Sequence, residues 1–162
     1  MTREEYNRCV DDHADGVFRF ILKNLKDEEK ACDIVQDAFT KMWEKLKDIS
    51  PGKSKSYLFS TAYHTMIDYI RREKRTTGIT DDDVEDSGSA GPDFPDVKEI
   101  LDMAVSRLPE VQRSVLLLRD YEGYSYNEIG EITGLNESQV KVYIFRARKT
   151  MKNYLVSIDK VI

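Results

Sequence analysis

One acidic segment divides this chain of 162 residues into two parts, and this division limits what the chain can fold into. Residues 76–99 hold eight acidic residues and a single lysine, which is a net charge of −7, together with three glycines and two prolines. Such a composition buries too little apolar surface to offset the entropy of ordering, so we predict a flexible acidic linker. The flanking parts, residues 1–75 and 100–162, are each near the lower size limit for a domain.

Apolar residues on both sides of the predicted linker recur at the spacing of an α-helix, and no segment alternates as a strand does. Two long amphipathic helices are expected over residues 10–25 and 31–46, and a third over residues 56–75. Shorter helices are expected after the linker. We therefore predict an all-α fold, in which the flexible acidic linker joins two small helical domains.

A helix-turn-helix motif is predicted in the second domain. Ser125 and Glu128 are spaced as a capping box, which typically opens a helix. Gly134 can adopt the positive φ of a tight turn, and either Asn136 or Ser138 can cap the helix that follows. The spacing is that of two helices joined by a short turn.

The second helix of this motif combines basic and apolar side chains on the face opposite Val140. Lysines and arginines there can reach DNA phosphates and guanine edges, and Phe145 and Val142 can contact thymine methyl groups. A merely solvated face would explain the cations but not an outward Phe145. The candidate DNA contacts are Ser138, Gln139, Lys141, Val142, Phe145, Arg146, Arg148 and Lys149.

Two further groups of residues in the first domain are candidates for binding. Aromatic residues and cations mix in the third expected helix, as single-stranded nucleic acid requires for base stacking and phosphate binding, although each aromatic could instead be a core residue. Asp33, Gln36 and Asp37 share one helix face, which is either solvated or a docking surface for a positive partner. The aromatic residues are Tyr57, Phe59, Tyr63 and Tyr69, and the cations are Arg71, Arg72, Lys74 and Arg75.

Taken in order, these motifs resemble the extracytoplasmic-function sigma factors of bacterial RNA polymerase. Residues 33–43 resemble region 2.2, which in the family docks on the coiled coil of the polymerase beta-prime subunit. Residues 57–72 resemble regions 2.3 and 2.4, which open the minus-ten element and hold its non-template strand. Residues 108–130 resemble region 4, which binds the beta flap, and residues 140–148 match the helix that binds the minus-thirty-five element.

The resemblance assigns roles to individual residues of both domains. Residues 1–75 would be the region 2 domain and residues 100–162 the region 4 domain, and the loop over residues 49–55 would hold a base flipped from the stack. The implied polymerase docking residues are Asp33, Gln36, Asp37, Phe39 and Trp43. The implied minus-ten contacts are Lys53, Ser54, Tyr57, Tyr63, His64, Arg71, Arg72, Lys74 and Arg75.

The resemblance implies an alternative sigma factor that binds core RNA polymerase and directs promoter recognition, DNA melting and transcription initiation. It would be a cytoplasmic protein with no catalytic activity, cofactor, metal site, small-molecule substrate or membrane insertion of its own. Its expected partners are core polymerase, promoter DNA and an anti-sigma factor. From the charge of −7 we further hypothesise that the linker folds back over basic residues of the free protein and suppresses DNA binding, which neutralising residues 81–86 would relieve.

Two alternatives belong to other classes of protein. A stand-alone helix-turn-helix regulator would form a dimer and bind palindromic DNA tightly without polymerase. A nuclease could hold magnesium with carboxylates such as Asp33, Asp37 and Asp68, but no third acid has the spacing to join the first two.

Overall fold

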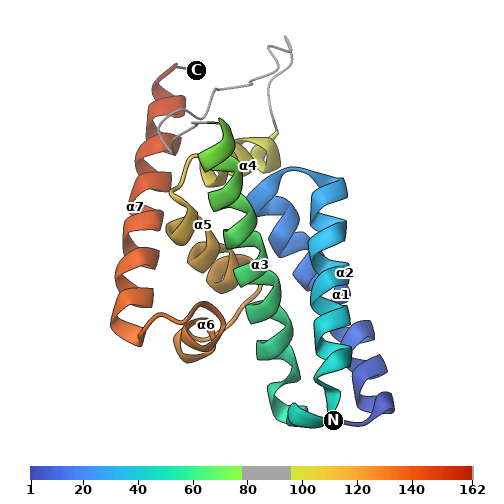
Figure 1. Ribbon diagram of the computed structural model, residues 1–162. Coiled ribbons are helices and arrows are strands. Elements are labelled where there is room, and N and C mark those ends of the chain that lie inside the picture. Colours follow the sequence, from blue (N-terminus) through green and yellow to red (C-terminus); the bar gives the residue numbers. More distant parts are fainter. Residues whose placement is uncertain (78–95, 162) are drawn as a thin grey trace.

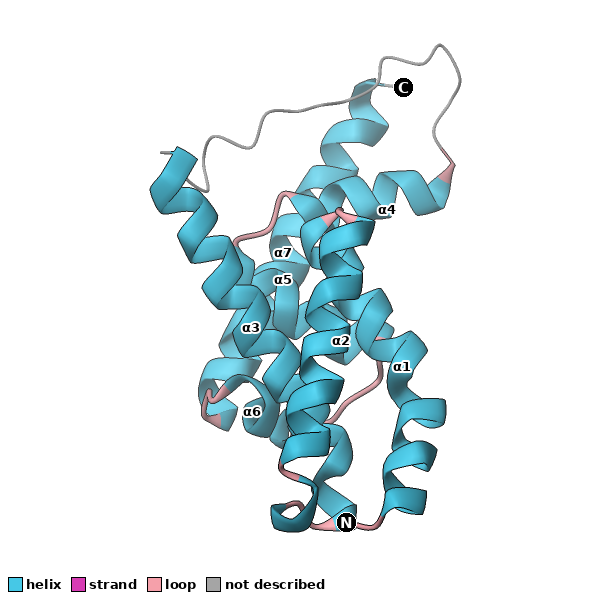
Figure 2. Ribbon diagram, turned by 45° about the vertical axis from the view of Figure 1, so that its right-hand side comes forward, coloured by secondary structure: helices cyan, strands magenta, loops and turns pink. Residues whose placement is uncertain are grey.

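The computed structural model describes residues 1–77 and 96–161, and within these ranges the chain forms helices and short connections without strands (Figures 1 and 2). The predicted all-α class is confirmed. The middle of the predicted linker lies outside the described residues, and with it the hypothesis about residues 81–86. The two ends of that segment differ from the prediction, because residues 76–77 and 97–99 are helical.

Three helices form the first half of the protein. They are α1 (Arg3–Leu25), α2 (Glu28–Glu44) and α3 (Ser54–Thr77), with two 3₁₀ turns, Leu46–Asp48 and Pro51–Lys53, between the second and the third. Each of the three packs against the other two. The break between the helices expected over residues 31–46 and 56–75 is confirmed, and it contains Pro51 and Gly52, since proline and glycine favour a turn over a continued helix.

The second half is built around its last helix. Helices α4 (Val97–Ser106), α5 (Glu110–Leu116) and α6 (Tyr126–Thr133) all contact α7 (Glu137–Val161). A π-helical turn, Leu117–Tyr121, leads from α5 toward α6. In Figure 1, α7 runs along one side of the molecule and α6 lies at its lower end.

The predicted helix-turn-helix is confirmed in α6 and α7. The Ser125 hydroxyl accepts from the Glu128 N–H, and the Glu128 carboxylate accepts from the Ser125 N–H, both at 3.1 Å. Gly134 ends α6 with φ 81°, the left-handed conformation that glycine adopts without strain. Gly130 lies one turn earlier, where an added Cβ would be 2.8 Å from the Leu135 carbonyl oxygen.

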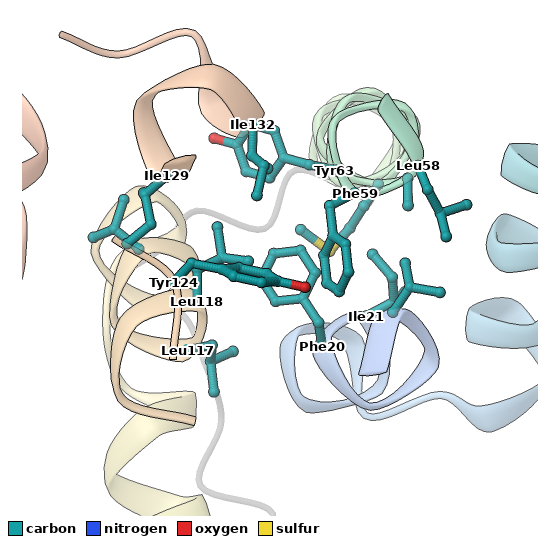
Figure 3. Packing of buried hydrophobic residues seen from close by; sticks show 14 of the residues in the cluster. Phe20, Ile21, Leu58, Phe59, Tyr63, Leu117, Leu118, Tyr124, Ile129 and Ile132 are labelled. Carbon is teal, nitrogen blue, oxygen red and sulfur yellow. The ribbon is translucent and has the colours of Figure 1, made fainter. Parts of the chain in front are cut away.

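One hydrophobic core spans both halves (Figure 3). The Phe59 ring of α3 meets the Tyr124 ring edge-on, with their centroids 5.1 Å apart, and it also lies 6.0 Å from the Phe20 ring of α1. Figure 3 shows Leu117 and Leu118 of the second half facing the side chains of α1 and α3. The two predicted domains therefore share buried surface in this structure.

A buried polar link accompanies this apolar contact. Asn24 of α1 accepts at Oδ1 from Arg113 Nε at 2.9 Å and from the Ser114 hydroxyl at 3.2 Å. Its Nδ2 donates to the Phe20 carbonyl oxygen at 2.9 Å, so both ends of the amide have partners. Because a buried amide without partners is costly, this link favours one docking geometry of α1 on α5.

We predict that Gly130→Ala lowers the free energy of unfolding by about 1–3 kcal/mol, because the new methyl group would press on the Leu135 carbonyl in a closely packed turn. Urea unfolding followed by circular dichroism measures the change. Gly52→Ala is the matched control, since nothing lies within 4 Å of a Cβ at that position. Equal unfolding midpoints for the two variants would contradict the prediction.

Candidate nucleic-acid interface

Helix α7 presents the predicted basic and apolar face to solvent. Val140, Ile144 and Ala147 are buried on the opposite side of the helix, and α7 packs against α5. Phe145 is 69% exposed and Val142 is 43% exposed. Their exposure confirms the predicted division of this helix into a buried stripe and an outward face that holds an aromatic ring among cations.

Two of the predicted DNA contacts on α7 are paired with acids of the protein. Arg148 donates from Nε and Nη2 to the two carboxylate oxygens of Asp120, at 3.1 and 2.5 Å, and these hydrogen bonds raise the pKa of the guanidinium. Lys141 lies 3.4 Å from the Glu137 carboxylate one turn away. Arg148 therefore also ties α7 to the π-helical turn, a role that the sequence pattern did not indicate.

The first turn of α7 is closed by a reciprocal cap. The Asn136 Oδ1 accepts from the Gln139 N–H at 2.8 Å, and the Gln139 Oε1 accepts from the Asn136 N–H at 3.0 Å. Of the two capping residues considered from sequence, Asn136 is the cap, and Ser138 is exposed on the helix surface. Gln139, predicted as a DNA contact, has its side-chain oxygen engaged in this cap.

A groove of about 510 Å³ lies along α3 and contains three of the predicted minus-ten residues, Lys53, Tyr57 and His64. Hydroxyl groups, two carboxylates and a second ammonium group complete its polar lining, and α2 and α6 contribute one lining residue each. The remaining lining residues are Lys41, Ser56, Ser60, Thr61, Thr65, Asp68 and Glu131. An aromatic ring among hydroxyls and cations suits an unstacked base and its phosphate.

Tyr63 departs from the prediction. Its side chain is only 6% exposed, because it points from α3 into the shared core, close to Ile132 (Figure 3). Burial raises the pKa of its hydroxyl. We therefore correct the expectation that this ring lies on the surface. Ser54 is half-buried, and its hydroxyl donates to the Pro51 carbonyl oxygen at 3.0 Å, which closes the preceding turn.

The predicted basic cluster lies in the last turns of α3. Arg71, Arg72 and Arg75 are exposed there, and Lys74 is half-buried with its ammonium 4.0 Å from the Glu110 carboxylate. These cations follow Asp68, the last groove residue on α3, within about two turns along the same helix. The structure therefore arranges the predicted minus-ten residues along the length of α3 instead of gathering them in one pocket.

Carboxylates of α6 reach the loop and first turn that begin α3, a contact that was not predicted. Glu131 lies 3.1 Å from the Lys53 ammonium and accepts from the Ser56 hydroxyl at 3.3 Å. Glu128 lies 2.7 Å from the Lys55 ammonium, and this contact is the main cause that lowers the pKa of the Glu128 carboxyl. No local pattern could reveal these pairs, because their members are more than 70 residues apart.

Helix α2 carries the predicted docking surface on its outer face. Trp43 is 46% exposed, and the ring of Tyr6 supports it edge-on with a centroid distance of 5.0 Å. The Tyr6 hydroxyl donates to the Phe39 carbonyl oxygen at 3.1 Å, and the Phe39 side chain is half-buried. The exposed polar members of this surface are Asp33, Gln36 and Asp37.

Metal binding and membrane insertion are two further properties that distinguish classes of protein. Within residues 1–77 and 96–161, no group of three or more His, Cys, Asp or Glu side chains is arranged to hold a metal ion, as the nuclease alternative requires. Over the same described ranges, none of the helices has the length and apolar character of a membrane span.

Comparison with known proteins matches both halves of the chain in order. Residues 9–76 match the family sigma-70 region 2, and residues 98–151 match the family sigma-70, region 4. The chain is 30% identical to the RNA polymerase sigma factor SigV of Bacillus subtilis (strain 168), over 93% of this chain and 91% of SigV. It is also 30% identical to the ECF RNA polymerase sigma factor SigM of the same organism, over 86% and 88% of the two chains.

Solved structures share the fold. The sigma factor RpoE of Bartonella quintana, in complex with the anti-sigma factor NepR, matches with a TM-score of 0.78 and 22% identity over 94% of this chain and 97% of RpoE. CnrH, in complex with the cytosolic domain of CnrY, matches with a TM-score of 0.71 and 20% identity over 96% of this chain and 90% of CnrH.

The chain belongs to the sigma-70 family. Within that family it is an extracytoplasmic-function sigma factor, a protein that directs promoter recognition and transcription initiation. The alternative of a stand-alone regulator finds no support, because region 2 accounts for the half that such a regulator would use for dimerisation.

We predict that Asn136→Ala lowers the free energy of unfolding by about 1 kcal/mol, since it removes the cap of α7, while Asn136→Ser largely retains it. Ser138→Ala serves as the control, because Ser138 is exposed and is not the cap. Thermal unfolding of the three variants beside the parent protein measures the difference. A Ser138→Ala variant as unstable as Asn136→Ala would argue against the assigned cap.

Proposed function

We propose that this sigma factor binds core RNA polymerase through α2 and reads the two promoter elements with α3 and α7. The observation that carries the proposal is the exposure of Phe145 and Val142 among cations on a helix-turn-helix, in a chain whose other half is a region 2 domain. Each small module alone would bind DNA weakly, and tethering both to one enzyme makes the second contact effectively intramolecular. The protein would act without catalysis, in the cytoplasm, where the polymerase works.

The outer face of α2 is the proposed contact with the beta-prime coiled coil. Exposed carboxylates beside a half-exposed Trp43 offer charge for steering and an aromatic anchor, the combination that typically dominates binding energy at interfaces. The apolar groove between α4 and α7, of about 720 Å³, is the proposed site for the beta flap. Its apolar lining includes Leu101, Met151 and Leu155.

We predict that Asp33→Arg combined with Gln36→Ala abolishes co-elution with bacterial core RNA polymerase on a sizing column, because charge reversal places a cation where the partner is positive. The matched control makes the same two kinds of change on an exposed face of α1, Asp11→Arg with Asn7→Ala, and should co-elute. If the parent protein formed no complex, and instead shifted duplex DNA as a dimer, the sigma assignment of these surfaces would fail.

The outward face of α7 is the proposed reader of the minus-thirty-five element. Arg146 and Lys149 are exposed and have no ion-pair partner among the residues that the structure describes. They are therefore available for phosphates or guanine edges, while Phe145 and Val142 would meet thymine methyl groups in the major groove. The groove along α3, with Tyr57 and His64, is the proposed site for the separated minus-ten strand.

We predict different effects for two substitutions on α7 when the holoenzyme selects sites from a randomised duplex library. Phe145→Ala should relax the base preference at one or two positions, because it removes an apolar contact with base edges. Lys149→Ala should weaken binding to all sequences alike and reduce the salt slope by about 1, as the loss of one phosphate contact does. Identical selection profiles for Phe145→Ala and the parent would exclude Phe145 as a reader.

An anti-sigma factor is the last proposed partner. Both related structures described above were solved with a partner chain, the anti-sigma factor NepR in one and the cytosolic domain of CnrY in the other. Their folds match this chain over nearly its whole length, which supports a partner of the same kind here. Pull-down with the tagged sigma factor as bait, followed by inhibition of transcription by the captured protein, tests this proposal.

A further inference from the structure

Helix α6 lies against α3 at the end of α3 that forms the minus-ten groove (Figure 1). The contact brings Glu131 into the lining of the groove itself, together with Lys53, Tyr57 and His64. In this structure, the first helix of the region 4 helix-turn-helix therefore occupies part of the surface that region 2 would use for DNA.

Across this contact, carboxylates of α6 meet lysines and a hydroxyl at the start of α3, which are the groups that bind phosphates in a protein–DNA interface. Lys53 lines the groove and Lys55 lies in the first turn of α3, and they pair with Glu131 at 3.1 Å and Glu128 at 2.7 Å. The other cation of the groove, Lys41, lies 3.2 Å from Asp37 of its own helix. The Ser56 hydroxyl, a typical donor to phosphate oxygens, donates instead to Glu131 at 3.3 Å. Two carboxylates thus satisfy three groups that would otherwise be available to a phosphate backbone.

Apolar packing holds the carboxylates in place. The Tyr124 ring, which directly precedes the cap of α6, packs edge-on against Phe59 of α3, and the Lys55 ammonium lies 4.4 Å from its centroid. On the other side of the contact, Arg19 of α1 forms two hydrogen bonds with Glu122, at 2.8 and 2.7 Å. Since the contact is both packed and charged, α6 cannot leave the groove without exposing apolar surface.

The other two proposed surfaces stay open in the same arrangement. Asp33, Gln36 and Asp37 are exposed on α2, and Trp43 is 46% exposed. The outward face of α7 is exposed as well, with Phe145 at 69%. The closed arrangement therefore covers the groove for separated DNA and leaves the polymerase-docking face and the duplex-reading face accessible.

We propose that α6 is an autoinhibitory element of the free protein: its carboxylates, Glu128 and Glu131, take the place of DNA phosphates on the minus-ten groove, so that α6 and a single DNA strand exclude each other. The inference rests on the proposed function, because it takes the groove to be the minus-ten site. It also implies an order of events. The closed protein can dock on polymerase through α2, and α6 must leave α3 before the separated strand is captured.

The first test measures binding of the free protein to a labelled single-stranded DNA 12-mer of random sequence by fluorescence anisotropy. Glu128→Gln with Glu131→Gln should bind about tenfold more tightly than the parent, because a larger fraction of the molecules is open. Glutamine retains the capping box, since it can replace the glutamate of that motif. The control, Glu4→Gln with Glu44→Gln, removes two exposed charges outside the contact.

The second test follows the distance between the two halves. Cys32 on α2 is exposed and Cys9 is buried, so Cys32 and an added Thr150→Cys on α7 can carry a donor and an acceptor dye. Energy transfer should fall in the Glu128→Gln, Glu131→Gln variant, and in the parent it should fall as salt screens the charge pairs. The variant with Glu4→Gln and Glu44→Gln should keep the energy transfer of the parent.

The outcomes separate this inference from the proposed function. Tighter strand binding together with lower energy transfer, in the groove variant alone, supports autoinhibition by α6. Equal strand affinity in the parent and both variants would overturn it, as would unchanged energy transfer in the groove variant. Either negative result leaves the polymerase co-elution experiment unaffected, so the failure of α6 as an inhibitor is distinguishable from the failure of the sigma assignment.

Discussion

The packing of the two halves on each other is the contact on which the rest of this structure depends. Each half is near the lower size limit for a stable domain, and joining them buries the rings of Phe20, Phe59 and Tyr124 in one core. Asn24 adds a satisfied polar link that favours one geometry over others. The same contact decides which functional surfaces are covered, because it places α6 over the first turns of α3.

The three proposed surfaces differ in how their charges are arranged. The outer face of α2 is acidic and aromatic, and α7 carries exposed cations beside Phe145. At the start of α3, Lys53 and Lys55 are paired with acids of α6. A net charge of −5 for the whole chain therefore says little about DNA binding. The local arrangement decides which cations are available, because exposed charges more than about 8 Å apart are largely screened at physiological salt.

Individual residues show which parts of the fold and of the candidate sites could be predicted from the sequence. The capping box of Ser125 and Glu128, the turn at Gly134 and the exposed Phe145 were predictable, because each depends on neighbours within a few residues. Tyr63 was misplaced because helical spacing does not reveal whether another element covers that side of α3. Arg148 was predicted as a DNA contact from its position on the helix, but its pairing with Asp120 depends on how α7 packs against the π-helical turn.

The sequence by itself determined the helical class, the helix-turn-helix and the membership of the sigma-70 family, because periodicity, caps and family motifs are local properties of the chain. Only the tertiary structure decided how the two halves meet. Contacts such as Lys53 with Glu131 and Arg19 with Glu122 join residues more than 70 positions apart, and they form only when apolar surfaces from both halves are buried together. For that reason, the accessibility of each predicted surface is a property of the folded protein.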